Sequence, residues 1–283
     1  MQILDRNGLS NIEYAEPFAG GAAVALALLL EDYASTIYIN DLSRPVYAFW
    51  HTVLNATSEL CRRVEQADLT VGEWRRQRAV YNRRHDADLE ELGFATLYLN
   101  RTNRSGIVSG GLIGGYEQSG EWGIDARFNR ADLIQRIRRI GRYRSRIQLF
   151  QLDARVFVRD VVTKLKKGPF VFLDPPYIEK GEDLYLNDYL LDDHRELARQ
   201  VSNLNQHWMV TYDPPADDAG LFPNSTRITY GLPYTANLRY EGKEMMFLDG
   251  RLRLPVEWTK HEIFSLAPAR SRHPLLARLR TPA

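Results

Sequence analysis

The chain has 283 residues, of which 44% are hydrophobic and 26% are charged, and its formal net charge is +1. These values are typical of a globular protein and exclude a chain that is disordered over most of its length. The longest apolar run, Ala22 to Leu30, is too short to span a bilayer, and no basic-then-apolar signal sequence opens the chain. The single cysteine, Cys61, excludes an internal disulfide and a cysteine metal cluster. We therefore expect a soluble cytoplasmic protein with no membrane partner and no metal site.

The first forty residues predict the opening of a βαβ unit. Residues 12–18 alternate like a short strand, and Ala19-Gly20-Gly21 break it. Residues 22–30 are rich in helix formers, and residues 36–39 form a second apolar run that ends at Asn40-Asp41. Strand, glycine turn, helix and strand in this order are typical of a parallel sheet.

The middle of the chain predicts helices and one structured loop. Residues 44–85 have few strand signals, and residues 94–99 are apolar. Residues 110–123 are too rich in glycine to pack as a regular element, so we expect a loop there. Residues 131–146 return to helical spacing, with apolar residues on one face and arginines on the other.

Positive charge is concentrated in this middle region. Residues 56–146 carry 17 arginines, no lysine and 12 acidic residues, and residues 127–146 alone carry eight arginines against Asp132. A basic patch on a nearly neutral protein indicates contact with a polyanion. The alternative is a solvated helix face.

The α/β pattern resumes after residue 146. We predict strands at 147–150, 170–173 and 207–211, helices at about 154–166 and 192–205, and a closing antiparallel pair at 226–230 and 243–248. The sequence therefore predicts an α/β sheet domain, residues 1–55 and 147–255, interrupted by a mainly helical insertion, residues 56–146. A basic tail, residues 256–283, follows, and we expect its end to be mobile.

The tetrapeptide Asp174-Pro175-Pro176-Tyr177 follows the apolar run 169–173 directly. Two prolines without N–H groups must stop strand pairing at once. The chain thus presents a carboxylate, two rigid carbonyls and an aromatic ring at the carboxyl end of a strand, where open α/β sheets bind ligands. A planar ring that carries an amine fits this array. A strand that ends in a proline-rich turn is the simpler alternative.

Other predicted strand ends carry polar or glycine residues. Glu16-Pro17-Phe18-Ala19-Gly20-Gly21 lacks the patterns of dinucleotide and triphosphate sites, which are therefore not favoured. Asp41, 25 residues after Glu16, could bind a ribose diol or cap the helix near Ser43. Asp153 could accept from an adenine amino group or cap a helix. The histidines show no metal-ligand spacing, and we expect structural or solvated roles for His51, His85 and His194.

The order and spacing of these segments resemble the Dam-like N6-adenine-specific DNA methyltransferases, from about Ile12 to Leu248. The resemblance includes residues 97–102 and 125–130 of the insertion, Pro233-Tyr234, and residues 243–247. It implies a Rossmann-like S-adenosylmethionine-dependent methyltransferase sheet with an inserted DNA-recognition domain, double-stranded DNA as partner, and a target adenine flipped out of the duplex. The resemblance further implies that the catalytic residues are Asp174, Pro175, Pro176 and Tyr177. It implies that the cofactor is contacted by Glu16, Phe18, Ala19, Gly20, Gly21, Asp41, Asp153 and Ala154. It implies that the DNA is contacted by Asn100, Arg101, Asn103, Arg104, Arg127, Asn129, Arg138 and Arg139.

Two alternatives remain beside this interpretation. The family carries a tract with an aromatic residue, a glycine and a lysine before its glycine turn, and residues 1–15 contain nothing like it. A catalytically silent or partner-dependent DNA-binding homologue, with a partner protein supplying what this tract provides, is therefore one alternative. Methylation of RNA or of a glutamine amide is the other, but those enzymes usually begin the motif with Asn, so Asp174 favours DNA adenine. The target sequence and any pairing with a restriction enzyme stay open.

Overall fold

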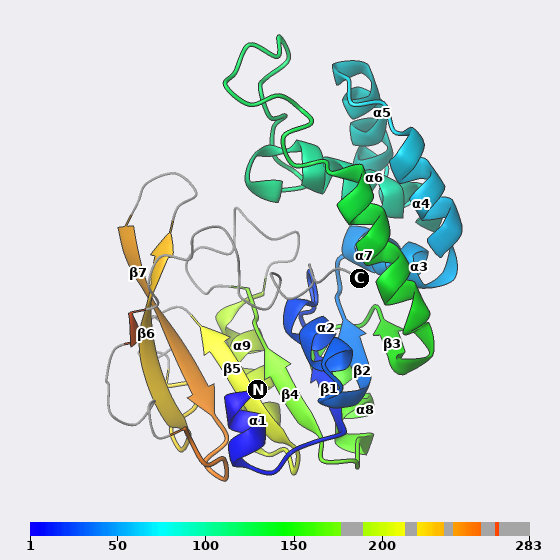
Figure 1. Ribbon diagram of the computed structural model, residues 1–283. Coiled ribbons are helices and arrows are strands. Elements are labelled where there is room, and N and C mark those ends of the chain that lie inside the picture. The colour runs from blue at the N-terminus through cyan, green and yellow to red at the C-terminus, as the bar shows by residue number, and fades with distance from the viewer. Residues whose placement is uncertain (177–188, 213–219, 235–239, 256–263, 266–283) are drawn as a thin grey trace. The chain divides into compact units, whose positions relative to one another are not determined.

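The computed structural model describes residues 1–176, 189–212, 220–234, 240–255 and 264–265 (Figure 1). The chain forms two compact units. Unit 1 consists of residues 1–39 and 153–283, and unit 2 consists of residues 40–152. Across the described residues, no helix is both long and apolar enough to cross a membrane.

Unit 1 is built on a mixed sheet. Its strands are β1 (Ile12–Glu16), β2 (Ala34–Asn40), β4 (Phe170–Leu173), β5 (His207–Tyr212), β6 (Thr226–Tyr234), β7 (Tyr240–Leu248) and β8 (Phe264–Ser265). They lie in the order β2-β1-β4-β5-β7-β6-β8. The strands β2, β1, β4 and β5 pair in parallel with their neighbours in this order, and β7 pairs antiparallel with both β5 and β6. This arrangement confirms the predicted α/β fold and the closing antiparallel pair.

The helices of unit 1 are α1 (Gln2–Arg6), α2 (Ala23–Leu30), α8 (Ala154–Asp160) and α9 (Leu191–Ser202), with a 3₁₀ turn at Val162–Lys164. Parallel strands end at one edge of a sheet, so β1, β4 and β5 bring their carboxyl ends together. The register pairs Leu173 with Val210, which sets Asp174 beside Thr211. The fold thus gathers the predicted strand-end residues of unit 1 at one edge.

Unit 2 is mainly helical. Its elements are α3 (Arg44–Asn55), α4 (Thr57–Gln66), α5 (Val71–Asn82), α6 (Leu89–Thr102), α7 (Arg130–Arg142) and β3 (Ile147–Phe150), with 3₁₀ turns at Arg104–Gly106 and Arg144–Arg146. Side chains of Thr70, Asp88 and Asn129 cap α5, α6 and α7, which explains where these helices begin.

Hydrogen bonds join the two ends of unit 2. The Asn40 side chain donates to the Leu152 carbonyl and accepts from the Leu152 N–H, each at 2.9 Å. The Asp41 N–H donates to the Phe150 carbonyl at 3.3 Å. The unit begins before the predicted insertion of residues 56–146 because α3 packs against α6, and it ends after that insertion because β3 packs against α3.

The crossing of α3 and α6 depends on Gly93. A Cβ atom at this position would lie 2.2 Å from Thr52 Oγ1 and 2.5 Å from the Ala48 carbonyl oxygen. We expect Gly93→Ala to destabilise the protein by about 1–3 kcal/mol, because the added methyl group must push the helices apart. Thermal unfolding should show a midpoint lower by several degrees.

Gly72→Ala in α5 is the matched control, since its added Cβ would have Thr70 Oγ1 at 3.8 Å as its nearest neighbour. This change should leave the midpoint unchanged or raise it, because alanine favours helix. Equal midpoints for Gly93→Ala and the wild type would contradict the predicted clash.

Candidate active site and nucleic-acid interface

Two carboxyl groups end neighbouring parallel strands of unit 1. Glu16 is the last residue of β1, and Asp174 directly follows β4. The two differ in burial, because Glu16 has only 4% of its surface exposed, whereas Asp174 keeps access to solvent. The negative charge of Asp174 contributes to a raised pKa of Glu16, although burial of Glu16 is the larger cause.

The Glu16 carboxyl group is held in place by two hydrogen bonds. Its Oε1 accepts from the Tyr14 hydroxyl at 2.8 Å and from the Ala25 N–H at 2.9 Å. Burial raises the pKa of Glu16 to about 8, and the two hydrogen bonds oppose this shift. Glu16 therefore ties β1 to the first turns of α2, on the two sides of the glycine turn.

Glu16 should make stability depend on pH in the neutral range. Its pKa is about 8 in the folded protein, against an ordinary value of 4.5, so the folded state holds the proton more tightly than the unfolded state does. The stabilising contribution is therefore full below about pH 4.5 and is lost as the pH rises through 8. We expect the unfolding free energy of the wild type to fall relative to Glu16→Gln by up to about 1.4 kcal/mol per pH unit across this window.

Denaturant unfolding at pH 5 and pH 8 measures this difference. Glu13→Gln is the control, because Glu13 accepts from the N–H groups of Lys166 and Lys167 and these bonds lower its pKa, although burial opposes them. Between pH 5 and pH 8, Glu13 is mostly ionised in both states, because its pKa in the folded protein lies below the ordinary value of 4.5. The stability of Glu13→Gln should therefore change with pH almost as that of the wild type does. A pH-independent difference between the wild type and Glu16→Gln would contradict a proton on Glu16.

The glycine turn between β1 and α2 leaves open space beside its backbone. Gly20 has φ +47°, and neither Gly20 nor Gly21 would have a heavy atom within 4 Å of an added Cβ. Ala22 also has a left-handed conformation, with φ 47°, at the N-cap of α2. The first turn of α2 contains no acidic residue. A ligand can therefore approach this backbone closely, which fits the predicted cofactor contacts of Ala19, Gly20 and Gly21.

Asp174 is oriented by the neighbouring strand. Thr211 Oγ1 donates to Asp174 Oδ1 at 2.7 Å. Desolvation raises the pKa of Asp174, the hydrogen bond from Thr211 opposes this rise, and the charge of Glu244 adds to it. Pro175 is buried, Pro176 is half-buried, and Tyr177 lies outside the described residues. The geometry leaves Asp174 as a solvent-accessible acceptor at the end of the sheet.

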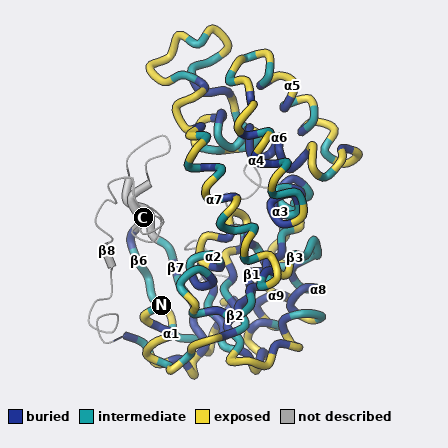
Figure 2. Tube along the Cα trace, turned by 45° about the vertical axis from the view of Figure 1, so that its right-hand side comes forward, coloured by how far each residue is buried: buried dark blue, intermediate teal, exposed yellow. Residues whose placement is uncertain are grey.

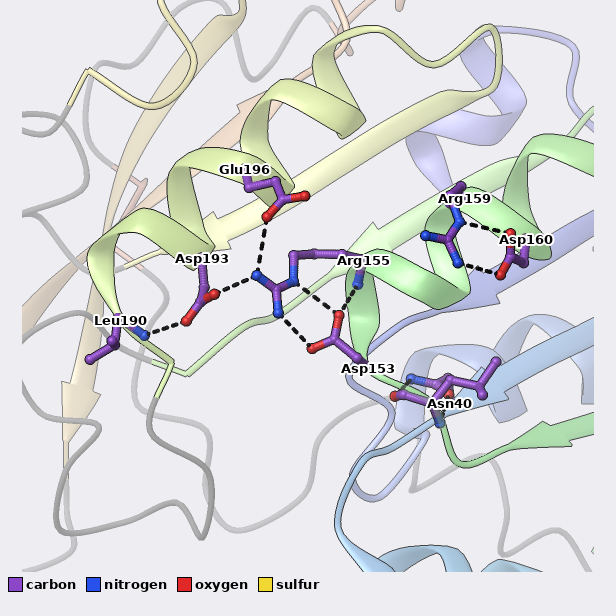
Figure 3. Close-up of polar contacts among 9 residues, drawn as sticks. Asn40, Asp153, Arg155, Arg159, Asp160, Leu190, Asp193 and Glu196 are labelled. Atoms are coloured by element: carbon purple, nitrogen blue, oxygen red, sulfur yellow. Dashed lines mark hydrogen bonds and ion pairs between the residues drawn. The ribbon is translucent and has the colours of Figure 1, made fainter.

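Asp153 is bound to Arg155. Asp153 Oδ1 accepts from the Arg155 N–H at 2.9 Å, which caps α8, and from Arg155 Nε at 3.0 Å. The same guanidinium forms ion pairs with Asp193 and Glu196 of α9, as Figure 3 shows. Arg155 lowers the pKa of Asp153, although burial opposes this. The capping alternative is therefore realised, and Arg155 Nη2 also donates to Asp153 Oδ2 at 3.3 Å.

An aromatic chain connects the glycine turn to α9. The Phe18 ring lies edge to face against Tyr189 at 5.8 Å, and Tyr189 lies against His194 at 4.9 Å. His194 is fully buried, and its Nδ1 lies 2.8 Å from the Tyr212 hydroxyl. His194 thus has the structural role predicted for it. Sequence reasoning missed Tyr189 and Thr211, although Thr211 ends a predicted strand and could have been found by that signal.

Asp41 lies in unit 2, just before α3. Its Oδ1 accepts from the N–H of Ser43, the N-cap residue of α3, at 2.9 Å. This N–H precedes the first turn, and no side chain caps α3, so the capping alternative considered for Asp41 is wrong. Among the described residues, no group of three or more His, Cys, Asp or Glu side chains could hold a metal ion.

Three of the predicted DNA contacts shape the chain around the end of α6. Asn100 accepts from the Arg101 guanidinium and donates to the Gly106 carbonyl at 2.7 Å. Asn103 is fully buried, accepts from Trp74 Nε1 at 2.7 Å and donates to the Ile107 and Val108 carbonyls. The buried amide of Asn103 therefore holds the loop that follows, and its side chain faces no solvent.

The remaining predicted DNA contacts lie at or near the surface. Arg104, Arg127, Asn129 and Arg138 are exposed, and Arg139 is half-buried. Two aromatic residues of the glycine-rich loop, residues 103–129, were not singled out from sequence. Tyr116 is 58% exposed and Trp122 is 64% exposed, and most of this loop is exposed in Figure 2. Arginines and exposed aromatic rings together are typical of a nucleic-acid surface.

Comparison with known proteins identifies the family of the chain. The sequence model of the D12 class N6 adenine-specific DNA methyltransferases matches residues 2–232. No curated protein matches the chain. Solved structures with a likeness include TrmN from Thermus thermophilus, with TM-score 0.37, 13% identity and coverage of 87% of this chain and 46% of that one. The rRNA methyltransferase aviRa from Streptomyces viridochromogenes has TM-score 0.36, 12% identity and coverage of 87% and 79%. The match over residues 2–232 establishes that the chain belongs to the D12 class N6 adenine-specific DNA methyltransferase family.

Proposed function

We propose that the protein transfers a methyl group from S-adenosylmethionine to the N6 amine of an adenine in double-stranded DNA. The observation that carries this proposal is Asp174, an accessible carboxylate at the end of β4, oriented by Thr211 at 2.7 Å and followed by two prolines. Family membership supports adenine as the substrate. When bound, the cofactor supplies an activated methyl group on a sulfonium cation.

The residues of unit 1 that would hold the cofactor are grouped around the glycine turn. Gly20 and Gly21 offer backbone beside open space, and Glu16 anchors the turn through the Ala25 N–H. Phe18 is packed on Tyr189, which limits its motion. Further predicted contacts come from Ala19, Asp153 and Ala154 in unit 1 and from Asp41 in unit 2.

Asp174 and the Pro175 carbonyl would accept hydrogen bonds from the adenine amine. These acceptors draw electron density toward the N6 lone pair and hold it for in-line transfer. The Tyr177 ring would stack on the base, which must leave the duplex to reach the strand ends. No residue of the chain needs to form a covalent intermediate.

Unit 2 would bind the DNA. Arg138 and Arg139 on α7, with Arg104 and Arg127 of the glycine-rich loop, would contact phosphates or guanine edges. Tyr116 and Trp122 offer ring faces on which bases or sugars can pack. Asn103 would act by holding the loop in shape, through its bonds to Ile107 and Val108.

A methyl-transfer assay with the isolated chain tests the proposal. Purified protein, radiolabelled S-adenosylmethionine and mixed-sequence double-stranded DNA should yield N6-methyladenine in the DNA. RNA and a glutamine-containing peptide serve as competing acceptors. Binding of DNA without any transfer would instead support a silent or partner-dependent homologue, and transfer only to RNA or peptide would overturn the choice of substrate.

A further inference from the structure

Unit 2 contains a cleft that none of the proposed functions uses. Its volume is about 390 Å³, within the range of roughly 300–1,000 Å³ in which proteins bind small ligands. It lies between α3 and the segment that leads from the 3₁₀ turn Arg144–Arg146 into β3. The residues that line it are Tyr47, His51, Leu54, Asn55, Arg144, Ser145, Ile147 and Leu149.

The polar side of this cleft suits an anion. Arg144 and Ser145 are exposed, and Arg144 forms no ion pair with any described residue. The described lining contains no Asp or Glu, so nothing there competes for the guanidinium. Arg142 lies two residues before Arg144 and adds to the positive potential. An arginine fork beside a hydroxyl is typical of a phosphate site.

His51 adds a second group that lacks an internal partner. Its Nδ1 is buried and has no hydrogen-bond partner within the described part of the chain. The ring borders the cleft, so a ligand bound there lies beside it. We expected a structural or solvated role for His51 from the sequence, and a ligand contact goes beyond that expectation.

The aromatic and apolar part of the cleft suits a flat ring. The Tyr47 and His51 rings are 6.0 Å apart with an interplanar angle of 36°. Leu54, Ile147 and Leu149 supply apolar surface next to them. A bare phosphate would leave this surface uncovered, whereas a nucleotide carries both an anion and an aromatic base.

We propose that this cleft binds a single nucleotide, with its phosphate at Arg144 and Ser145 and its base against Tyr47 and His51. The nucleotide is either a free mononucleotide or one unit of the bound DNA. The inference does not depend on methyl transfer, because none of the lining residues belongs to the proposed catalytic set.

Calorimetric titration of the full-length chain with thymidine 5′-monophosphate tests the cleft. Saturating S-adenosylmethionine is present, so that binding at the proposed cofactor site does not contribute. We expect saturable binding that Arg144→Gln weakens about tenfold or more, because the variant cannot form a charged hydrogen bond to the phosphate. Thymidine without phosphate should bind more weakly than the nucleotide, and inorganic phosphate should also bind more weakly.

Arg62→Gln is the matched control, since Arg62 is an exposed arginine of α4 that pairs with Glu59 and does not line the cleft. It should bind the nucleotide as the wild type does. A second variant, Tyr47→Leu, should weaken the nucleotide but not inorganic phosphate, which separates the base side of the cleft from its phosphate side.

Competition with double-stranded DNA identifies the source of the nucleotide. Displacement of the mononucleotide by DNA, together with weaker DNA binding by Arg144→Gln, would assign the cleft to a nucleotide unit of DNA. Simultaneous binding of both would assign it to a free mononucleotide. Absence of saturable nucleotide binding, or equal weakening by Arg62→Gln, would overturn the proposal whatever the outcome of the methyl-transfer assay.

Discussion

Replacement of Asp174 by alanine is expected to lower the methyl-transfer rate about a hundredfold or more. The variant lacks the strand-end acceptor for the adenine amine, and one preorganised interaction of this kind typically contributes two to three orders of magnitude. Single-turnover measurements with saturating DNA and cofactor give the rate directly. Asp174→Asn keeps an acceptor oxygen and should retain more of the rate.

The structure offers a control for the removal of a carboxylate alone. Asp192 is an exposed acid of unit 1 that pairs with Arg195, and Asp192→Ala should retain the wild-type rate.

Because the pKa of Asp174 is raised, chiefly by desolvation, the wild-type rate should also fall on acidification at a pH above the ordinary range of an aspartate. If Asp174→Ala transferred the methyl group at the wild-type rate, the proposed catalytic role of Asp174 would be wrong.

Neutralising the outer arginines of α7 should have the second large effect, on DNA affinity. Arg138, Arg139 and Arg142 lie away from the buried residues Leu133 and Ile137. For every phosphate that an arginine no longer neutralises, the slope of log affinity against log salt should become shallower by roughly 0.9. We expect the triple glutamine variant to bind DNA much more weakly at low salt, with a slope reduced by up to about 2.7, three times this value.

Arg136 is left unchanged in this variant, because it already pairs with Asp132 at 3.1 Å within α7. The triple change Arg62→Gln, Arg76→Gln and Arg83→Gln removes the same charge and is the control for net charge alone, because these arginines pair with Glu59, Glu73 and Glu91. An equal change of slope in both variants would mean that the α7 arginines act only through overall charge. Binding of S-adenosylmethionine, measured without DNA, should be unaffected in either variant.

The amino-acid sequence by itself determined the order of elements and the end of β4, whereas β1 ends at Glu16, two residues before the predicted end at residue 18. The prolines at 175 and 176 must end β4, and the glycines at 20 and 21 favour a turn between β1 and α2, whatever surrounds them. These effects of proline and glycine on the backbone need no contact with residues elsewhere in the chain. For the same reason the capping role considered for Asp153 could be named in advance, since a cap bonds to N–H groups one to three residues away.

Interactions between residues distant in the chain could not be predicted in this way. Thr211 meets Asp174 only because β5 pairs with β4 in one register, and the burial that raises the pKa of Glu16 depends on how the sheet and α2 pack. An asparagine on the surface can contact DNA, but the Asn103 side chain is buried, where it accepts from Trp74 and donates to a loop carbonyl. The cleft beside His51 likewise requires α3 and β3 to lie together. The residue type fixes which hydrogen bonds a side chain can form, but tertiary packing decides whether that side chain faces solvent, a ligand or the interior.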